Sequence, residues 1–268
     1  MQTRKSGTIA RWGAGLASIF SLMSQSARSQ DLDGVSTEPT GQTWSLTLGG
    51  MVGVAPHYDG ADRDRVQPLP FFGATYRDTV SVGLGGIGVT VLRADGFTVT
   101  PTLGYGGGRK ESWDSELKGL GTIEPALTAG VLLKYQTGPF MFSVTPREAV
   151  IQERDGFSAV VAAGYAWHAT PRLEFTFGPE LTLADGKREQ TYFGIDALQS
   201  ARSGKRLYSP GGGVENVGAG GGVTYRIDDH WQLLGRVSDH VLVGDAADSP
   251  IVRSKSQASA TTGIAYHF

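Results

Sequence analysis

The sequence predicts an all-β protein, a transmembrane antiparallel up-and-down β-barrel of about 12 strands, with about 10 or 14 as alternatives. Three observations lead to this fold class: long segments of alternating apolar and polar residues, loops that alternate between short and long, and an N-terminal secretion signal. Strands of soluble proteins cluster near ~5–6 residues, whereas a strand that crosses the hydrocarbon layer needs ~9–11. Several alternating segments have the greater length, which favours a barrel over a soluble β-sandwich.

The N-terminus has the layout of a secretory signal peptide. Basic residues come first, the apolar run Gly13–Met23 follows, and small residues end the segment. The apolar run is shorter than the ~20 residues that a membrane-spanning helix needs, which disfavours the alternative of a membrane anchor. We therefore expect a signal peptide over residues 1–29, a flexible periplasmic segment over 30–42 and the barrel over 43–268.

The composition excludes several classes of function. Hydrophobic residues make up 40% of the chain, which is low for a helical membrane protein, and no segment approaches the ~18 apolar residues of a membrane helix. Asp and Glu (26) outnumber Lys and Arg (24), so nothing suggests a nucleic-acid partner. There is no cysteine, hence no disulfide framework and no thiolate metal site.

Catalytic and cofactor motifs are missing as well. The five histidines show no metal-ligand spacing, and neither a nucleophile elbow nor a phosphate-binding loop occurs. Asp239 and His240 are adjacent, but neighbours in a strand point to opposite faces and would not meet. We therefore expect no enzyme, no cofactor and no metal.

The alternating segments follow one another along the chain. Apolar residues take every second position in segments that begin near Phe97, Thr122, Phe140, Phe157, Arg172 and Ser256. The opposite face carries Thr, Gly and charged residues, as in the lumen of a barrel. Aromatic residues lie near the ends of these segments, where barrels carry girdles at the membrane interfaces: Tyr76, Tyr105, Tyr135, Tyr165, Trp167 and Tyr225.

The stretch Ser81–Val91, SVGLGGIGVTV, contains the spacing G-x-G-x-x-G of dinucleotide-binding loops. That motif requires a helix after its last glycine, because the helix N-terminus faces the pyrophosphate. The residues after Gly88 are β-branched and predict a strand instead. We expect a tight hairpin at Gly85–Gly86, between the strands Val80–Leu84 and Ile87–Arg93, which brings the count to twelve.

The lengths of the loops predict an orientation. Short connections are expected at residues 77–78, 94–96, 136–138, 169–171 and 228–230, and long ones at 55–66, 108–121, 148–156, 185–212 and 242–254. Outer-membrane barrels have short periplasmic turns and long extracellular loops. The short connections should therefore face the periplasm.

Charged residues opposite the apolar faces should point into the lumen, because Arg or Lys facing lipid costs ~2–4 kcal/mol at mid-depth. The candidates are Glu124, Lys134, Arg147, Arg172, Glu174, Glu180, Arg226 and Arg236. Glu174 and Glu180 share one face of a strand, and we expect Arg147 and Arg236 on facing strands to be their partners. The sequence leaves open whether these charges plug the lumen or line a water path.

The chain ends on an alternating strand with Ile264, Tyr266 and the terminal Phe268 on one face. Many outer-membrane barrels look like this at the C-terminus. The resemblance implies that these three residues form an assembly signal for the barrel-assembly machinery.

Motifs in order along residues 42–268 resemble the MltA-interacting protein (MipA/OmpV) family: APHYDGADRDRVQPLPFFGATYRD, YGGGRKESWDSELKGLGTIEP, TYFGIDALQSARSG, LVGDAADSPIV and GIAYHF. The resemblance implies a non-enzymatic barrel in the cell outer membrane, in contact with outer-membrane lipid. It also implies a scaffold that joins a murein hydrolase to a murein synthase. Other members are linked to small-molecule uptake, so a channel for small solutes is the alternative.

Positions that match the family motifs are Tyr58, Gly60, Arg109, Leu117, Gly119, Tyr192, Phe193, Gly194, Asp245, Asp248, Ser249 and Pro250. Most of them fall in the predicted outer loops. Oxygen atoms of Asp245, Asp248 and Ser249 could bind a cation. An Asx-type turn before Pro250 is the preferred interpretation.

Overall fold

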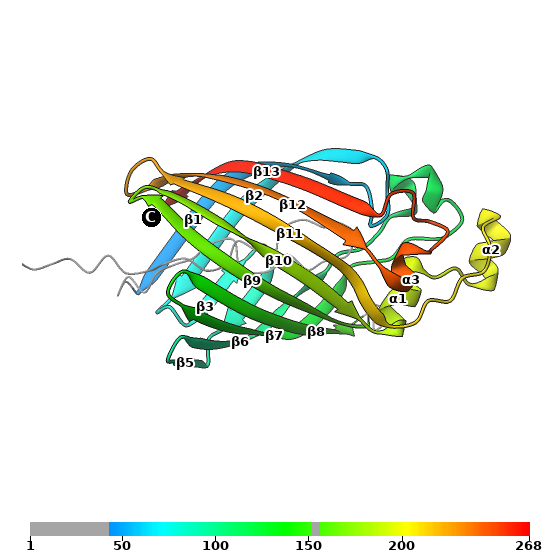
Figure 1. Ribbon diagram of the computed structural model, residues 1–268, viewed down its shortest axis with the longest axis horizontal. Coiled ribbons are helices and arrows are strands. Elements are labelled where there is room, and N and C mark those ends of the chain that lie inside the picture. Colours follow the sequence, from blue (N-terminus) through cyan, green and yellow to red (C-terminus); the bar gives the residue numbers. More distant parts are fainter. Residues whose placement is uncertain (1–42, 152–155) are drawn as a thin grey trace, which may run out of the picture.

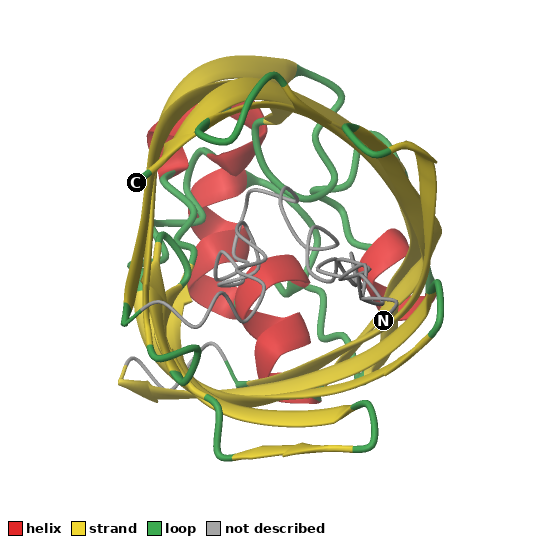
Figure 2. Cartoon of the chain, turned by 90° about the vertical axis from the view of Figure 1, so that its left-hand side faces the viewer, coloured by secondary structure: helices red, strands yellow, loops and turns green. Residues whose placement is uncertain are grey.

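The protein is a closed antiparallel β-barrel of twelve strands, as a computed structural model that describes residues 43–151 and 156–268 shows (Figures 1 and 2). The strands are β1 (Trp44–Pro56), β2 (Asp64–Tyr76), β3 (Val80–Gly83), β4 (Gly86–Val89), β5 (Leu92–Ala94), β6 (Phe97–Gly106), β7 (Ala126–Thr137), β8 (Phe140–Ile151), β9 (Phe157–Thr170), β10 (Leu173–Ala184), β11 (Gly213–Arg226), β12 (Trp231–Leu242) and β13 (Ser256–His267). The predicted fold class is confirmed. The predicted signal peptide and the segment 30–42 lie outside the described residues.

Sequence neighbours pair around the ring, and the first strand pairs with the last. β1 pairs with β13 over Thr47–Val54, and β4 pairs with β6. Because β4 and β5 pair with β6 one after the other, they are two parts of a single strand of the wall. This is why thirteen assigned segments make a barrel of twelve strands.

The long connections carry five short helices at one end of the barrel (Figure 1). They are η1 (Glu111–Trp113), η2 (Ser115–Leu117), α1 (Gly186–Phe193), α2 (Ala197–Ser203) and α3 (Gly244–Ala247). Within the described ranges, none of the helices is long and apolar enough to cross a membrane. The tight turns and the C-terminus lie at the opposite end, as the loop lengths predict.

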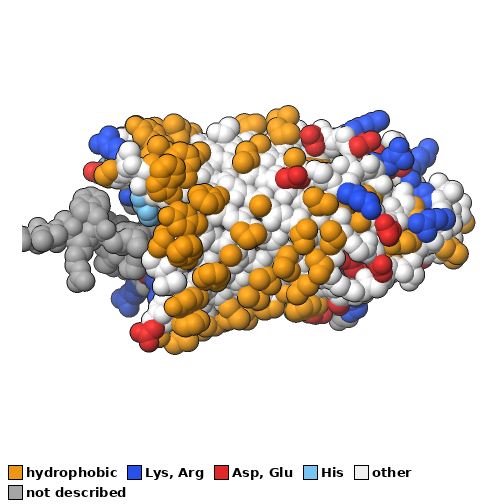
Figure 3. Space-filling model, viewed as in Figure 1, with side chains coloured by type: hydrophobic (Ala, Val, Ile, Leu, Met, Phe, Trp, Pro, Cys, Tyr) orange, Lys and Arg blue, Asp and Glu red, His pale blue; other side chains and the backbone are white. Residues whose placement is uncertain are grey.

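The two faces of the wall differ as the alternation requires. On β10 the outward Phe177 is 50% exposed, whereas the inward Glu174 and Glu180 are 6% and 8% exposed. On the face of the barrel that Figure 3 shows, apolar side chains are spread over the wall, and most charged side chains lie at the helix-bearing end. A lipid-facing apolar surface with a polar lumen is the arrangement of outer-membrane barrels.

Aromatic rings gather at the end with the tight turns. Pairs with ring centroids 4.4–5.5 Å apart include Trp44–Tyr76, Phe97–Tyr135, Trp167–Phe175 and Tyr266–Phe268. Such rings anchor a barrel at the level of the lipid headgroups. Tyr105 lies at the other end of the wall and is 62% exposed.

The glycine-rich stretch forms the predicted hairpin, with its turn at Leu84–Gly85 rather than at Gly85–Gly86. Gly86 begins β4 with φ +124°, and a Cβ atom there would lie 2.1 Å from the carbonyl oxygen of Leu103. The position therefore needs glycine for its backbone conformation and for the close approach of β6. A strand follows, so the nucleotide-binding geometry does not form.

The hairpin β3–β4 is too short to span the wall, and this leaves an opening in the pairing. β2 pairs with β1 along its whole length but with β3 only over Gly73–Tyr76. The remaining edge, Asp64–Phe72, has no strand neighbour on that side among the described residues. Nine residues of strand span roughly 30 Å. We call this opening the wall break: it lies between the edge Asp64–Phe72, the hairpin turn Leu84–Gly85 and the end of β6.

Candidate functional site: lumen and outer cap

The lumen holds carboxylates that are paired with histidines. Glu180 Oε1 lies 3.2 Å from His240 Nε2, and Glu174 Oε2 lies 3.1 Å from His168 Nε2. The sequence predicted Arg147 and Arg236 as the partners of these carboxylates, whereas these short contacts are made by histidines. The sequence analysis did not predict the histidines as lumen partners, because their spacing matches no metal site. They come close to the carboxylates only through the register of the strands.

A glycine lets the pair Glu180–His240 form across an intervening strand. In the register, Glu180 of β10 faces Gly218 of β11, which in turn faces His240 of β12. A Cβ atom on Gly218 would lie 2.5 Å from His240 Cδ2 and 2.4 Å from the carbonyl oxygen of Asp239. Because Gly218 has no side chain, the imidazole of His240 can lie over β11.

The predicted lumen charges separate into three groups. Lys134, Arg147, Glu174, Glu180 and Arg236 lie within strands at inward positions of the alternation. Arg226 is the last residue of β11 and is exposed at the tight-turn end. The expectation for Glu124 and Arg172 was wrong: both lie outside the strands and are exposed, because the strands begin one to two residues later than the alternation suggested.

Four long loops pack into one structure at the helix-bearing end, which we call the outer cap: residues 57–63, 107–125, 185–212 and 243–255. One apolar cluster contains Tyr58, Ala61, Leu117, Leu120, Ile195 and Ile251. A second contains Tyr192, Phe193, Leu242, Ala246 and Ala247. Seen along the barrel, the helices and loops of the cap lie across the far mouth (Figure 2).

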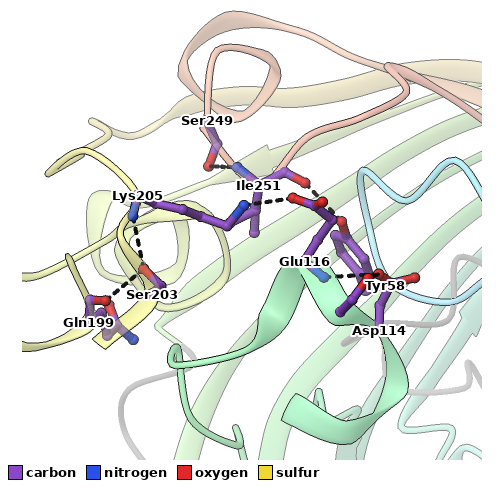
Figure 4. A network of polar contacts seen from close by, with 9 residues as sticks. Tyr58, Asp114, Glu116, Gln199, Ser203, Lys205, Ser249 and Ile251 are labelled. Atoms are coloured by element: carbon purple, nitrogen blue, oxygen red, sulfur yellow. Dashed lines mark hydrogen bonds and ion pairs between the residues drawn. The ribbon is translucent and has the colours of Figure 1, made fainter. Parts of the chain in front are cut away.

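Polar contacts connect the loops of the outer cap to one another (Figure 4). Tyr58 donates from its hydroxyl to the carbonyl oxygen of Ile251 at 2.9 Å. Lys205 Nζ lies 2.6 Å from Glu116 Oε2, and this ammonium holds the pKa of Glu116 below its ordinary value. Gln199 donates to the carbonyl oxygen of Leu120 at 2.8 Å. Each bond joins segments that are far apart in sequence, so the cap is a folded unit.

Buried charges lie beneath the cap, where the loops meet the wall. Arg188 Nε donates to Glu215 Oε2 at 2.9 Å, and the two side chains are 6% and 1% exposed. Although burial opposes the charged form, the carboxylate of Glu215 raises the pKa of Arg188. Arg109 is 2% exposed and donates to the carbonyl oxygen of Tyr192; burial lowers the pKa of Arg109 to about 10. Sequence reasoning identified Arg109 as a motif position but missed the Arg188–Glu215 pair.

Glu189 is a buried carboxyl group beside that pair. Glu189 is only 2% exposed. Its Oε2 atom has no hydrogen-bond partner in the described part of the chain. Burial and then the charge of Glu215 raise the pKa of Glu189 to about 8, against the opposing effect of Arg188. At neutral pH this carboxyl group is therefore mostly protonated.

The positions matching family motifs converge on the outer cap. Tyr58, Leu117, Tyr192 and Phe193 belong to its apolar clusters. Gly119 has φ +85°, and a Cβ atom there would lie 2.7 Å from the backbone nitrogen of Ser203. Gly60, Gly194 and Pro250 also lie in or beside these loops.

The segment 245–250 contains a cross-loop contact as well as a local turn. Asp245 Oδ2 accepts from the backbone N–H of Gly211 at 2.6 Å, and Asp248 lies 3.4 Å from Lys255. Ser249 donates to the carbonyl oxygen of Phe193 and accepts from Ile251 N at 3.5 Å, a local bond across Pro250. In residues 43–151 and 156–268, no group of three or more potential ligands is arranged to hold a metal ion.

The proposed assembly residues lie on the outer face of the last strand. Ile264 is 40% exposed and Phe268 is 62% exposed, and the ring of Tyr266 packs at 4.7 Å against that of Phe268. The backbone N–H of Phe268 donates to the carbonyl oxygen of Leu46. These residues are accessible from the lipid side of the junction between β13 and β1.

Comparisons with known proteins found one matching family model and several matching solved structures. A protein-family model described as "MltA-interacting protein MipA" matches residues 48–268. A comparison with curated protein sequences found no match.

The solved structures that match this chain include three porins. A NanC porin is 10% identical, with 83% of this chain and 98% of that chain covered and a TM-score of 0.39. A KdgM porin in complex with disordered oligogalacturonate is 10% identical, with 84% and 99% covered and a TM-score of 0.40. OprB of Pseudomonas putida is 12% identical, with 75% and 59% covered and a TM-score of 0.40.

Proposed function

Since the chain belongs to the MltA-interacting protein MipA family, whose model matches residues 48–268, we propose that this outer-membrane barrel is a non-catalytic interaction protein that binds a murein hydrolase at its periplasmic end. The family description, "MltA-interacting protein", names an interaction with MltA. The observation that carries the proposal is the outer cap: loops with a shared apolar core lie across the outer mouth, which disfavours an open diffusion pore.

The periplasmic rim offers the surface for such a partner. Its tight turns expose cations, anions and aromatic rings, among them Arg77, Arg93, Arg172, Asp228 and Trp44. Charges at the rim of an interface steer association and fix its orientation. Because the turns are short, the rim is shallow, and it suits a partner that docks on the end of the barrel.

A binding measurement tests the proposal. The purified barrel in detergent should bind a purified lytic transglycosylase of the MltA class, and the triple variant Arg77→Glu, Arg93→Glu, Arg172→Glu should weaken that binding. The matched control reverses three exposed charges of the outer cap, Lys110→Glu, Lys118→Glu and Arg202→Glu, and should leave binding unchanged. Equal loss in both variants, or no binding by the original chain, would contradict the proposal.

A channel for small solutes is the second candidate, and the lumen is the observation that favours it. The wall of the lumen is polar, with glycines at inward positions of β11 (Gly218, Gly220 and Gly222) and the pair Glu180–His240 on the neighbouring strands. A barrel of twelve strands lies between small filled barrels and open porins. Single-channel conductance in planar bilayers separates the candidates: a conducting barrel without affinity for the hydrolase would favour the channel.

A further inference from the structure

The inner face of the wall carries more positive than negative charge. In the described strands, the alternation places the carboxylates of Glu174 and Glu180 in the lumen, and both contact histidines. Glu215, at the irregularity of β11, is paired with Arg188 beneath the outer cap. Cations at inward positions outnumber these carboxylates: Arg65, Lys134, Arg147, Arg226 and Arg236. The wall of the lumen is therefore basic.

These cations lie at successive depths between the tight-turn end and the outer cap. Arg226 ends β11 at the tight-turn end. Counted from the same end, Lys134 lies three residues inside β7, Arg236 five residues inside β12 and Arg147 seven residues inside β8. At ~3.3 Å per residue of strand, the series extends over roughly 20 Å. A ligand that matches it is extended and carries several negative charges.

Solvent reaches part of this basic surface. Lys134 and Arg147 are of intermediate exposure although they point inward, and so are Thr102 of β6 and Ser143 of β8. Side chains that faced a filled interior of a closed barrel would be buried. The lumen beside β6, β7 and β8 is therefore not filled by the described side chains.

The chain that precedes β1 has the complementary charge. Residues 30–42, QDLDGVSTEPTGQ, contain Asp31, Asp33 and Glu38 and no basic residue. This segment lies outside the described residues and follows the expected signal peptide. Because β1 begins at Trp44 at the tight-turn end, the segment is joined to the barrel at the mouth of the lumen where the series of cations starts.

From this complementarity we propose that the acidic segment 30–42 folds back into the lumen of its own barrel and binds along the basic wall. An extended chain of 13 residues spans at most ~43–47 Å, so its carboxylates can reach each depth of the series. Salt screens ion pairs inside a protein less than exposed ones. Since the segment is attached at the mouth, binding is intramolecular and benefits from a high effective concentration. The inference goes beyond the proposed function, because it concerns a contact within one chain and requires no hydrolase.

The reactivity of single cysteines tests the proposal, because the natural chain has none. Ser36→Cys places a thiol in the segment, and Asp229→Cys places one in an exposed turn at the same end. The chain from Gln30 is refolded in detergent and treated with a maleimide on a polyethylene glycol too bulky to enter the barrel. Each rate is divided by that of the same variant unfolded in urea, which removes the effect of neighbouring charges on the thiol. Position 36 should react about tenfold more slowly than position 229, since several weak ion pairs together favour the bound state by about this factor.

Loss of the acidic charges should abolish this protection. Asp31→Asn, Asp33→Asn and Glu38→Gln, added to Ser36→Cys, should raise the rate at position 36 to that at position 229. The matched control, Thr37→Asn with Thr40→Asn, keeps the acids and should keep the protection. Lys134→Gln with Arg147→Gln should release the segment from the other side; if this variant fails to fold, the segment variant decides alone. Equal rates at positions 36 and 229 in the chain with its natural charges would overturn the proposal, and so would protection that survives loss of the three acids.

A cross-link locates the segment relative to the wall. Ser36→Cys is combined either with Ser143→Cys, at an inward position of β8, or with Val144→Cys, which points outward at the same depth and is 39% exposed. A short bismaleimide should join position 36 to position 143 within one chain and should not join it to position 144. A cross-link to position 144 would place the segment outside the barrel, and one between two chains would place it in a second copy; either result would refute the proposal.

Discussion

At the scale of single residues, the protein uses buried ionisable groups that are paired within the lumen and beneath the outer cap. Arg188 and Glu215 compensate each other, whereas Glu189 lies beside them with an unpartnered oxygen. An unpaired buried carboxyl group avoids the cost of its charge by binding a proton. The stability of the outer cap should therefore depend on pH.

Glu189→Gln should make the outer cap more stable in alkaline solution. The pKa of Glu189 is raised from 4.5 to about 8, so its contribution to stability is fully present below pH 4.5 and is lost as the pH rises to 8. The neutral Gln side chain does not lose a proton, so the variant keeps its stability at high pH. There its free energy of unfolding should exceed that of the original chain by ~1–3 kcal/mol. Proteolysis rates of the cap, compared between variant and original chain at each pH, measure it. Glu124→Gln, at an exposed carboxylate of the same loops, should follow the original chain; a similar gain there would disprove the assignment.

Gly218→Ala should lower the stability of the barrel. The added Cβ would meet both the His240 ring and the backbone of Asp239, so the Glu180–His240 pair must shift. Overpacking of this kind costs ~1–3 kcal/mol. Gly213→Ala on the same strand is the control, because nothing lies within 4 Å of its Cβ position. The temperature at which gel mobility changes is the readout, and equal temperatures for both variants would count against the role of Gly218.

At the scale of strands and loops, the sequence predicted the wall far better than the cap. A strand that separates lipid from lumen must alternate strictly, so its faces are visible in the sequence. The contacts of the cap have no such period, since a bond such as that from Tyr58 to Ile251 joins distant loops. One local signal was available: Asp196 and Gln199 form a capping box at the start of α2, and the pattern D-x-x-Q could have indicated that helix.

The two faces of β10 should respond in opposite ways to charge. Phe175→Arg with Phe177→Arg places two cations on the lipid side and should block insertion. An Arg facing lipid costs ~2–4 kcal/mol at mid-depth and ~0–1 kcal/mol near the interface, where Phe175 lies in the aromatic girdle, so Phe177→Arg should contribute more of the effect. Glu174→Gln with Glu180→Gln keeps the outer face intact and should allow insertion while it removes the acidic partners of His168 and His240. Outer-membrane levels in cells measure both. Tolerance of the arginines together with failure of the glutamines would mean that the faces are reversed.

Deletion of Phe268 should lower outer-membrane levels of the protein in cells. The ring lies exposed on the outer face at the end of β13, where the resemblance to other barrels implies contact with the assembly machinery. Phe97→Ala is the control, because Phe97 is a similarly exposed aromatic residue (55% against 62%) that is not terminal. Unchanged levels at native expression after the deletion would refute the role as an assembly signal.

At the scale of the whole molecule, we expect the packed loops of the outer cap to close the lumen at the helix-bearing end. Leu117 is fully buried (0% exposed) in the core of the cap, so Leu117→Asp should loosen the packed loops. Leu207→Asp is the control at a cap residue that is 61% exposed. Conductance in planar bilayers should rise for the first variant only. A high conductance of the original chain would show instead that the cap does not close the barrel.

The wall break also divides the circumference into stretches of unequal mechanical strength. β1 and β13 pair over the eight residues Thr47–Val54, whereas β3 pairs with β2 only over Gly73–Tyr76. Under lateral tension the pairing of β2 with the β3–β4 hairpin should therefore separate first. The pairing of β1 with β13, which closes the barrel, should remain. The wall should then open at this one place, while the other strands keep their pairing register.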